Sequence, residues 1–118
     1  MKKLLLLLTL PALTGFALVA TSGLHANSGD STLQILKFEA DWCGPCQKMK
    51  PVFSRVSRNL SDHARFRSVN IDNQPRVADA YDVQSVPTVI AIRDGRVVGR
   101  NVGYMNSTRL KAFVKRYQ

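Results

Sequence analysis

Hydrophobic and polar positions change period along the chain, and the changes mark elements of two kinds. Residues 33–39 (LQILKFE) form a short, mostly apolar run that is typical of a buried strand. Residues 44–60 follow a helical period instead, with apolar positions at Met49, Val52, Phe53, Val56 and Leu60. The first half of the chain therefore predicts a strand that is followed at once by a helix.

The middle of the chain repeats this alternation on a smaller scale. Residues 65–72 (RFRSVNID) predict a second strand, and residues 74–81 predict a short helix. Residues 85–93 (SVPTVIAIR) become β-branched and apolar after the proline, which predicts a buried strand.

The last elements are a hairpin partner and a helix. An Asp-Gly turn at 94–95 leads into residues 96–102, which we expect to form an antiparallel strand. Asn106 or Ser107 then caps a helix over residues 108–117, with one apolar face.

This order of elements predicts the topology. A strand, a crossover helix and a second strand form a right-handed βαβ unit with parallel strands. The hairpin and the final helix add a ββα unit. We therefore expect an α/β fold, βαβ plus ββα, with a four-stranded mixed sheet flanked by helices.

The N-terminus has a different composition. Lys2 and Lys3 precede a Leu-rich run over residues 4–20, and small polar residues follow, which is the layout of a secretory signal peptide. We expect residues 1–26 to be the signal peptide and residues 27–118 the domain, periplasmic or otherwise exported and without stable membrane insertion after cleavage. The alternative is an uncleaved anchor, because about 17 apolar residues are the least that can span a bilayer.

Charge adds little to this interpretation. The chain has 17 Lys and Arg against 8 Asp and Glu, a net charge of +9. The basic residues are scattered from Lys37 to Arg116 without a dense run, and export disfavours nucleic acid as a partner. We expect a solvated basic surface that attracts acidic partners weakly.

The chemistry of the chain is concentrated in its only two cysteines, Cys43 and Cys46. They fall where the first strand passes into the first helix, and free backbone N–H groups at a helix start favour a thiolate. Cys43 is therefore the candidate nucleophile. Cys46, three residues later on the same helix face, is close enough to close a disulfide and is the candidate resolving thiol.

Other roles for the pair are weaker. A structural disulfide across so short a loop contributes only about 2 kcal/mol in the chain-entropy model. A zinc site needs about four ligands, and only His25 and His63 accompany the cysteines, so no metal site is expected. Two further alternatives remain open: a protein-binding scaffold in which the thiols are incidental, and a dithiol that handles Cu(I).

Several short motifs give the chain a family resemblance. They are WCGPC at 42–46, Pro51, NID at 70–72, VPT at 86–88, DG at 94–95 and VG at 102–103. Their order and spacing resemble those of the thioredoxin family over nearly all of residues 33–118. The resemblance implies a thiol–disulfide oxidoreductase that exchanges a Cys43–Cys46 dithiol or disulfide with client proteins, with no cofactor.

The resemblance also implies roles for the residues around the cysteines. Trp42, Gly44 and Pro45 belong to the catalytic motif. In the family, the proline that matches Pro87 is cis and lies against the active-site disulfide. Val86, Pro87 and Gly103 are therefore expected to bind the substrate, with the Val86 backbone pairing with an extended client segment.

Two departures from the family stand out. The usual first strand and helix are missing before residue 33, so we expect a minimal version of the fold. Lys37 and Ser68 stand where thioredoxins carry a buried aspartate and its lysine partner. Glu39 points to the same face as Lys37. We hypothesise that Glu39 is the proton acceptor for Cys46, paired with Lys37; the alternative is that both side chains reach solvent.

The dipeptide between the cysteines indicates the direction of the reaction. Gly44 and Pro45 resemble the reducing members of the family, whereas strong oxidants usually carry a histidine there. We therefore expect a reductase. Because an exported compartment is oxidising, an electron donor has to recharge the pair, and the family resemblance suggests a membrane thiol reductase.

Overall fold

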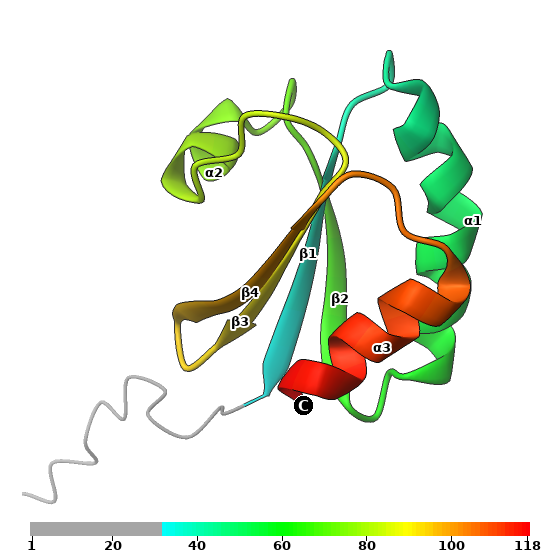
Figure 1. The fold of residues 1–118 in the computed structure, drawn as a ribbon. Coiled ribbons are helices and arrows are strands. Elements are labelled where there is room, and N and C mark those ends of the chain that lie inside the picture. The colour runs from blue at the N-terminus through cyan, green and yellow to red at the C-terminus, as the bar shows by residue number, and fades with distance from the viewer. Residues whose placement is uncertain (1–31) are drawn as a thin grey trace, which may run out of the picture.

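The computed structural model describes residues 32–118, which form a four-stranded sheet with helices on both faces (Figure 1). The elements follow in the order expected from the sequence. They are β1 (Leu33–Glu39), α1 (Gly44–Asn59), β2 (Ala64–Asn70), α2 (Pro75–Ala80), β3 (Thr88–Arg93), β4 (Arg96–Val102) and α3 (Ser107–Tyr117). The signal peptide expected over residues 1–26 lies outside the described residues.

The sheet has the strand order β2-β1-β3-β4. β1 is parallel to β2 and antiparallel to β3, and β3 is antiparallel to β4. The predicted α/β class, with βαβ plus ββα and a mixed sheet, is therefore confirmed. The hairpin turn has φ of 53° at Asp94 and 74° at Gly95, the left-handed backbone that an Asp-Gly turn between two strands favours.

β1 and β4 have the predicted bounds, and the ends of the other elements differ from the prediction by at most three residues. β2 ends at Asn70 because its side-chain oxygen accepts a hydrogen bond from the Asp72 N–H at 2.9 Å, which turns the chain out of the sheet. β3 begins at Thr88, directly after Pro87, which has no N–H to donate to a ladder. Asn106, not Ser107, is the N-cap of α3 and accepts from the Arg109 N–H at 2.9 Å.

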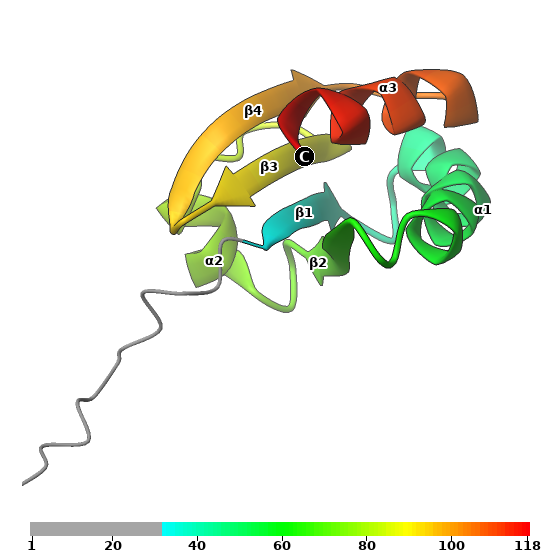
Figure 2. The same ribbon diagram turned by 90° about the horizontal axis from the view of Figure 1, so that it is seen from below.

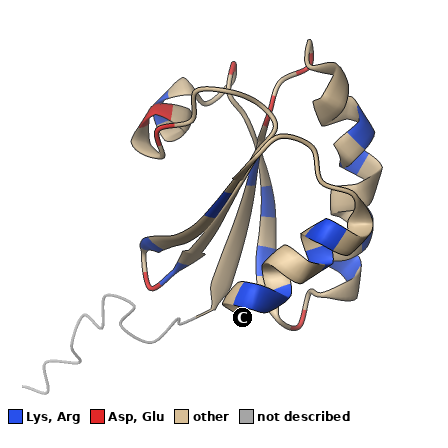
Figure 3. Ribbon diagram, viewed as in Figure 1, with Lys and Arg blue, Asp and Glu red and all other residues tan. Residues whose placement is uncertain are grey.

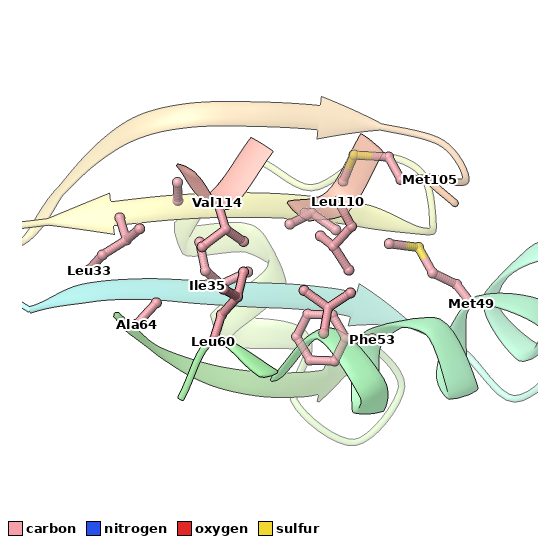
Figure 4. Close-up of a cluster of buried hydrophobic side chains, with 12 residues drawn as sticks. Leu33, Ile35, Met49, Phe53, Leu60, Ala64, Met105, Leu110 and Val114 are labelled. Atoms are coloured by element: carbon pink, nitrogen blue, oxygen red, sulfur yellow. The ribbon is translucent and has the colours of Figure 1, made fainter. Parts of the chain in front are cut away.

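The main core lies between the sheet and the two longer helices. α1 and α3 cover one face of the sheet, and α2 lies on the other (Figure 2). Leu33 and Ile35 of β1 point toward α1 and α3, where Phe53 and Leu110 are also buried (Figure 4). β1 thus contributes alternate residues to each face, as the pleat requires.

The opposite face carries a smaller core under α2. Arg100 of β4 crosses this face, and its guanidinium donates hydrogen bonds to the carbonyls of Tyr81 and Asp82 just past the end of α2. Arg67 of β2 similarly donates to the Gln74 side chain at 2.9 Å. Long arginine stems therefore cover apolar surface and cap a short helix on this face. No helix within residues 32–118 is both long and apolar enough to cross a membrane.

Candidate active site

The two cysteines lie at the first turn of α1, as the sequence predicts. Cys43 is the N-cap and Cys46 the third helical residue; the two form a disulfide, with Cα atoms 5.2 Å apart. The Cys46 N–H donates to Cys43 Sγ at 3.2 Å. Cys46 has no exposed surface, whereas Cys43 keeps 5%. Of the two cysteines, only Cys43 therefore keeps surface that a partner can reach, and its sulfur receives an N–H that would also stabilise its thiolate.

The loop before β3 lies directly against this disulfide. The Val86–Pro87 peptide bond is cis, as the family resemblance implies. The Val86 carbonyl oxygen lies 3.6 Å from Cys43 Sγ. Gly103, with φ of 101°, donates its N–H to the Pro87 carbonyl at 2.8 Å. The structure thus brings together the three residues expected to bind substrate, next to the accessible sulfur.

A polar rim borders the site on the side of β2. Trp42 is 70% exposed, and its indole N–H donates to Asp72 Oδ2 at 2.9 Å. The Asn70 amide donates to Asp41 Oδ1 at 3.3 Å. Sequence reasoning gave Asn70 and Asp72 no role, because their partners lie 29 and 30 residues away; the only signal was their place in the NID motif.

Near its C-terminal end, β1 carries a largely buried ion pair on the face that α1 covers. Lys37 Nζ lies 2.9 Å from Glu39 Oε2, and the two side chains keep only 2% and 13% of their surface exposed. The ammonium also lies 4.8 Å from the centre of the Phe53 ring, within cation–π range. Glu39 Oε2 accepts no well-aligned hydrogen bond within residues 32–118, so the Lys37 ammonium is its charge partner. The two side chains therefore pair with each other and do not extend into solvent.

Ser68 does not complete this pair. It lies beside Lys37 in the register between β1 and β2 and is exposed. The buried charged groups on this face of β1 are therefore Lys37 and Glu39, two residues apart on one strand. Glu39 is the nearer of the two along the chain to Cys43 and Cys46.

The arrangement suits thiol–disulfide exchange. Among residues 32–118, no group of three or more His, Cys, Asp or Glu side chains could hold a metal ion. A dithiol needs only an accessible sulfur, a second sulfur within bonding reach and a surface that aligns the partner's disulfide. Cys43, Cys46 and the Val86–Pro87 loop provide these three elements.

Comparison with known proteins agrees with this chemistry. The thioredoxin family model matches residues 24–116. The chain is 38% identical to a thioredoxin of Chlamydia trachomatis, over 79% of this chain and 90% of that protein, and 37% identical to thioredoxin 1 of Synechococcus elongatus, over 69% and 77%.

The fold agrees as well. The X-ray structure of Fasciola hepatica thioredoxin superimposes with a TM-score of 0.70 at 31% identity, over 75% of this chain and 83% of that one. The fold, the paired cysteines and these relatives lead to one conclusion: the chain belongs to the thioredoxin family of thiol–disulfide oxidoreductases, which act on disulfide-containing client proteins.

Proposed function

We propose that this protein works as an exported reductase of client disulfides and that a membrane thiol reductase returns it to the dithiol form. The observation that carries the proposal is the Cys43–Cys46 pair, with one sulfur reachable beside the Val86–Pro87 loop and the other buried. The Gly-Pro dipeptide between the cysteines supports the reducing direction. The leader-like composition of residues 1–26 supports export.

The reaction takes place in two exchanges. The Cys43 thiolate attacks one sulfur of the client disulfide; a bond forms between Cys43 and the client, and the other client sulfur leaves as a thiolate and takes a proton. Cys46 then loses its proton and attacks Cys43 Sγ. This step closes the Cys43–Cys46 disulfide, releases the second client thiolate and completes the transfer of two electrons to the client.

The second exchange needs a group that takes the proton of Cys46, and we assign this role to Glu39. Cys46 is fully buried, so its proton has no direct path to bulk water. The Glu39 carboxylate is on the adjoining strand, is mostly buried and is held by Lys37. The Lys37 ammonium holds this carboxylate in place, and a positioned carboxylate can act as a general base.

Trapping of mixed disulfides tests both the direction of electron transfer and the identity of the partner proteins. A Cys46→Ser variant, expressed with its full N-terminus in the native compartment, lacks the resolving thiol and should hold clients on Cys43 as mixed disulfides. Recovery of a membrane reductase together with client proteins supports the proposal. A Cys43→Ser variant is the matched control and should trap neither. If Cys46→Ser captures no partner, the protein-binding scaffold becomes the better account.

Export has its own test. The mature protein recovered from the compartment should begin near Asn27, which intact-mass measurement reads directly. A protein that retains residues 1–26 and sediments with membranes would favour the anchored alternative.

A further inference from the structure

An open groove lies between α3 and the end of β4, outside the cysteine site. Its volume is about 470 Å³, within the range of pockets that bind ligands. Apolar side chains of the loop after β4 and of α3 line it together with one amide and two guanidinium groups. The lining residues are Asn101, Met105, Arg109, Ala112, Phe113 and Arg116.

The two arginines are free to bind a ligand. Arg109 and Arg116 are seven residues apart on one flank of α3, which separates their Cα atoms by about 10 Å along the helix axis. Both are exposed, and neither guanidinium makes a hydrogen bond or ion pair within residues 32–118. No Asp or Glu occurs in α3 or in the neighbouring α1, and Figure 3 shows Lys and Arg at several positions along both helices. Such planar, unpaired guanidinium groups favour carboxylates in a two-point contact.

The floor between the arginines is apolar. Met105 is 2% exposed, and Phe113 is partly buried against the main core. A ligand that matches the groove therefore needs two acidic groups with an apolar or aromatic group between them. A bare anion would leave this floor uncovered.

The groove adjoins the site where a client disulfide would dock. Asn101 and Met105 lie two residues on either side of Gly103, which hydrogen-bonds to Pro87. The Asn101 amide also donates to the Gly103 carbonyl at 3.1 Å. A protein with its disulfide at Cys43 therefore has adjacent chain within reach of the groove.

We propose that this groove binds an acidic segment of the client protein, whose carboxylates pair with Arg109 and Arg116 while an apolar side chain between them covers the exposed part of Phe113. The proposal rests on the oxidoreductase activity of Cys43 and Cys46 and adds selectivity to it. The groove thus makes acidic clients better substrates without taking part in the exchange of sulfur bonds.

Kinetics with two model substrates test this. Both are peptides with the same disulfide; one continues into a segment with two acidic residues around a phenylalanine, and the other has glutamines in place of the acids. We expect kcat/KM to favour the acidic peptide about tenfold in the native protein, the effect of one well-formed charge-assisted contact. The variant Arg109→Gln, Arg116→Gln should lose that preference and keep the native rate on the glutamine peptide.

A matched control separates the groove from overall charge. Lys111 and Lys115 lie on the opposite flank of α3, since each residue turns the helix by about 100°, and they do not line the groove. The variant Lys111→Gln, Lys115→Gln loses the same charge and should keep the tenfold preference.

Three results would overturn the proposal. One is an equal loss of preference in the control variant, which would assign the effect to general surface charge. Another is equal rates on the two peptides in the native protein. The third is an arginine variant that still prefers the acidic peptide but no longer binds vesicles with 30% anionic phospholipid, to which the native protein binds. That result would identify a membrane surface, and not a client segment, as the ligand of the groove. Because the glutamine peptide reports exchange itself, failure of the oxidoreductase activity would be seen separately.

Discussion

The two ends of β1 present opposite kinds of side chain on the same face of the sheet. At its start, Leu33 and Ile35 are 1% and 0% exposed and pack among apolar neighbours from α1 and α3. At its end, Lys37 and Glu39 are also largely buried, yet they form an ion pair with Nζ and Oε2 2.9 Å apart. One end stabilises the fold, and the other carries a buried ion pair whose second member, Glu39, lies four residues before Cys43.

The difference between the two ends shows that a buried ion pair adds no stability over an apolar core and is useful only for its chemistry. Apolar side chains in the same positions would stabilise the sheet as well or better, since a buried ion pair repays its desolvation only in part. A carboxylate close to a buried thiol can move a proton, which no apolar side chain can do. The following predictions test this contrast, from the largest expected effect to the smallest.

Removing one member of the ion pair should have the largest effect on stability. Lys37→Met leaves Glu39 buried without its partner, and we expect the free energy of unfolding to fall by about 3–5 kcal/mol. Removing both charges in Lys37→Met, Glu39→Met should restore most of that loss. Urea denaturation of the three proteins measures both values; a loss below about 1 kcal/mol in Lys37→Met would mean that the pair is effectively solvated.

At the apolar end, Ile35→Ala should destabilise the fold by about 3 kcal/mol, because it leaves a cavity in the main core. The rate of disulfide exchange by the folded protein should stay the same. The same denaturation series and a small-disulfide assay check this. A large change in exchange rate at full folding would contradict the division of β1 into two ends.

Gly99→Ala tests packing of the same core from the side of β4, and it should lower the free energy of unfolding by less than Ile35→Ala does. A Cβ at this position would overlap the Tyr117 ring, so the ring has to move. We expect a loss of about 2 kcal/mol, typical of overpacking. Gly44→Ala is the control for packing, because the space around its added Cβ is open. Gly95→Ala cannot serve as this control, because its φ of 74° would strain any residue with a Cβ.

The polar rim should have the smallest effect. Asp72→Ala removes the hydrogen bond to the exposed Trp42 indole, and the expected loss is about 1 kcal/mol or less. Trp42 is the only tryptophan, so its fluorescence reports the change directly. If Asp72→Ala lowered the free energy of unfolding as much as Lys37→Met does, the polar rim, and not the buried ion pair, would be the main source of stability at this end of the sheet.

Much of this structure could be predicted from local patterns. The bounds of β1 and β4 follow from apolar runs and turn residues, and the cysteine site follows from a motif within five residues. The contacts of Asn70 and Asp72 could not be predicted, since they depend on how β2 lies beside β1. The groove on α3 was also missed: Arg109 and Arg116 look like ordinary surface residues until the loop after β4 places an apolar floor between them.

The central claim is that the charged end of β1 serves the chemistry of Cys46, and the rate of the resolving step tests it most directly. Single-turnover kinetics can follow release of a chromogenic thiol from the mixed disulfide on Cys43 across a range of pH. We predict that Glu39→Gln slows release about 100-fold, the lower part of the range for a positioned base, and flattens its pH dependence.

Two controls make the measurement specific. Asp62→Asn loses the same charge at an exposed loop position between α1 and β2 and should behave as the native protein. The Lys37→Met, Glu39→Met protein has no unpaired buried charge, so it should fold normally. It should nevertheless release the thiol as slowly as Glu39→Gln, because both proteins lack the group that accepts the proton of Cys46. Native rates and native pH dependence in Glu39→Gln would contradict the account.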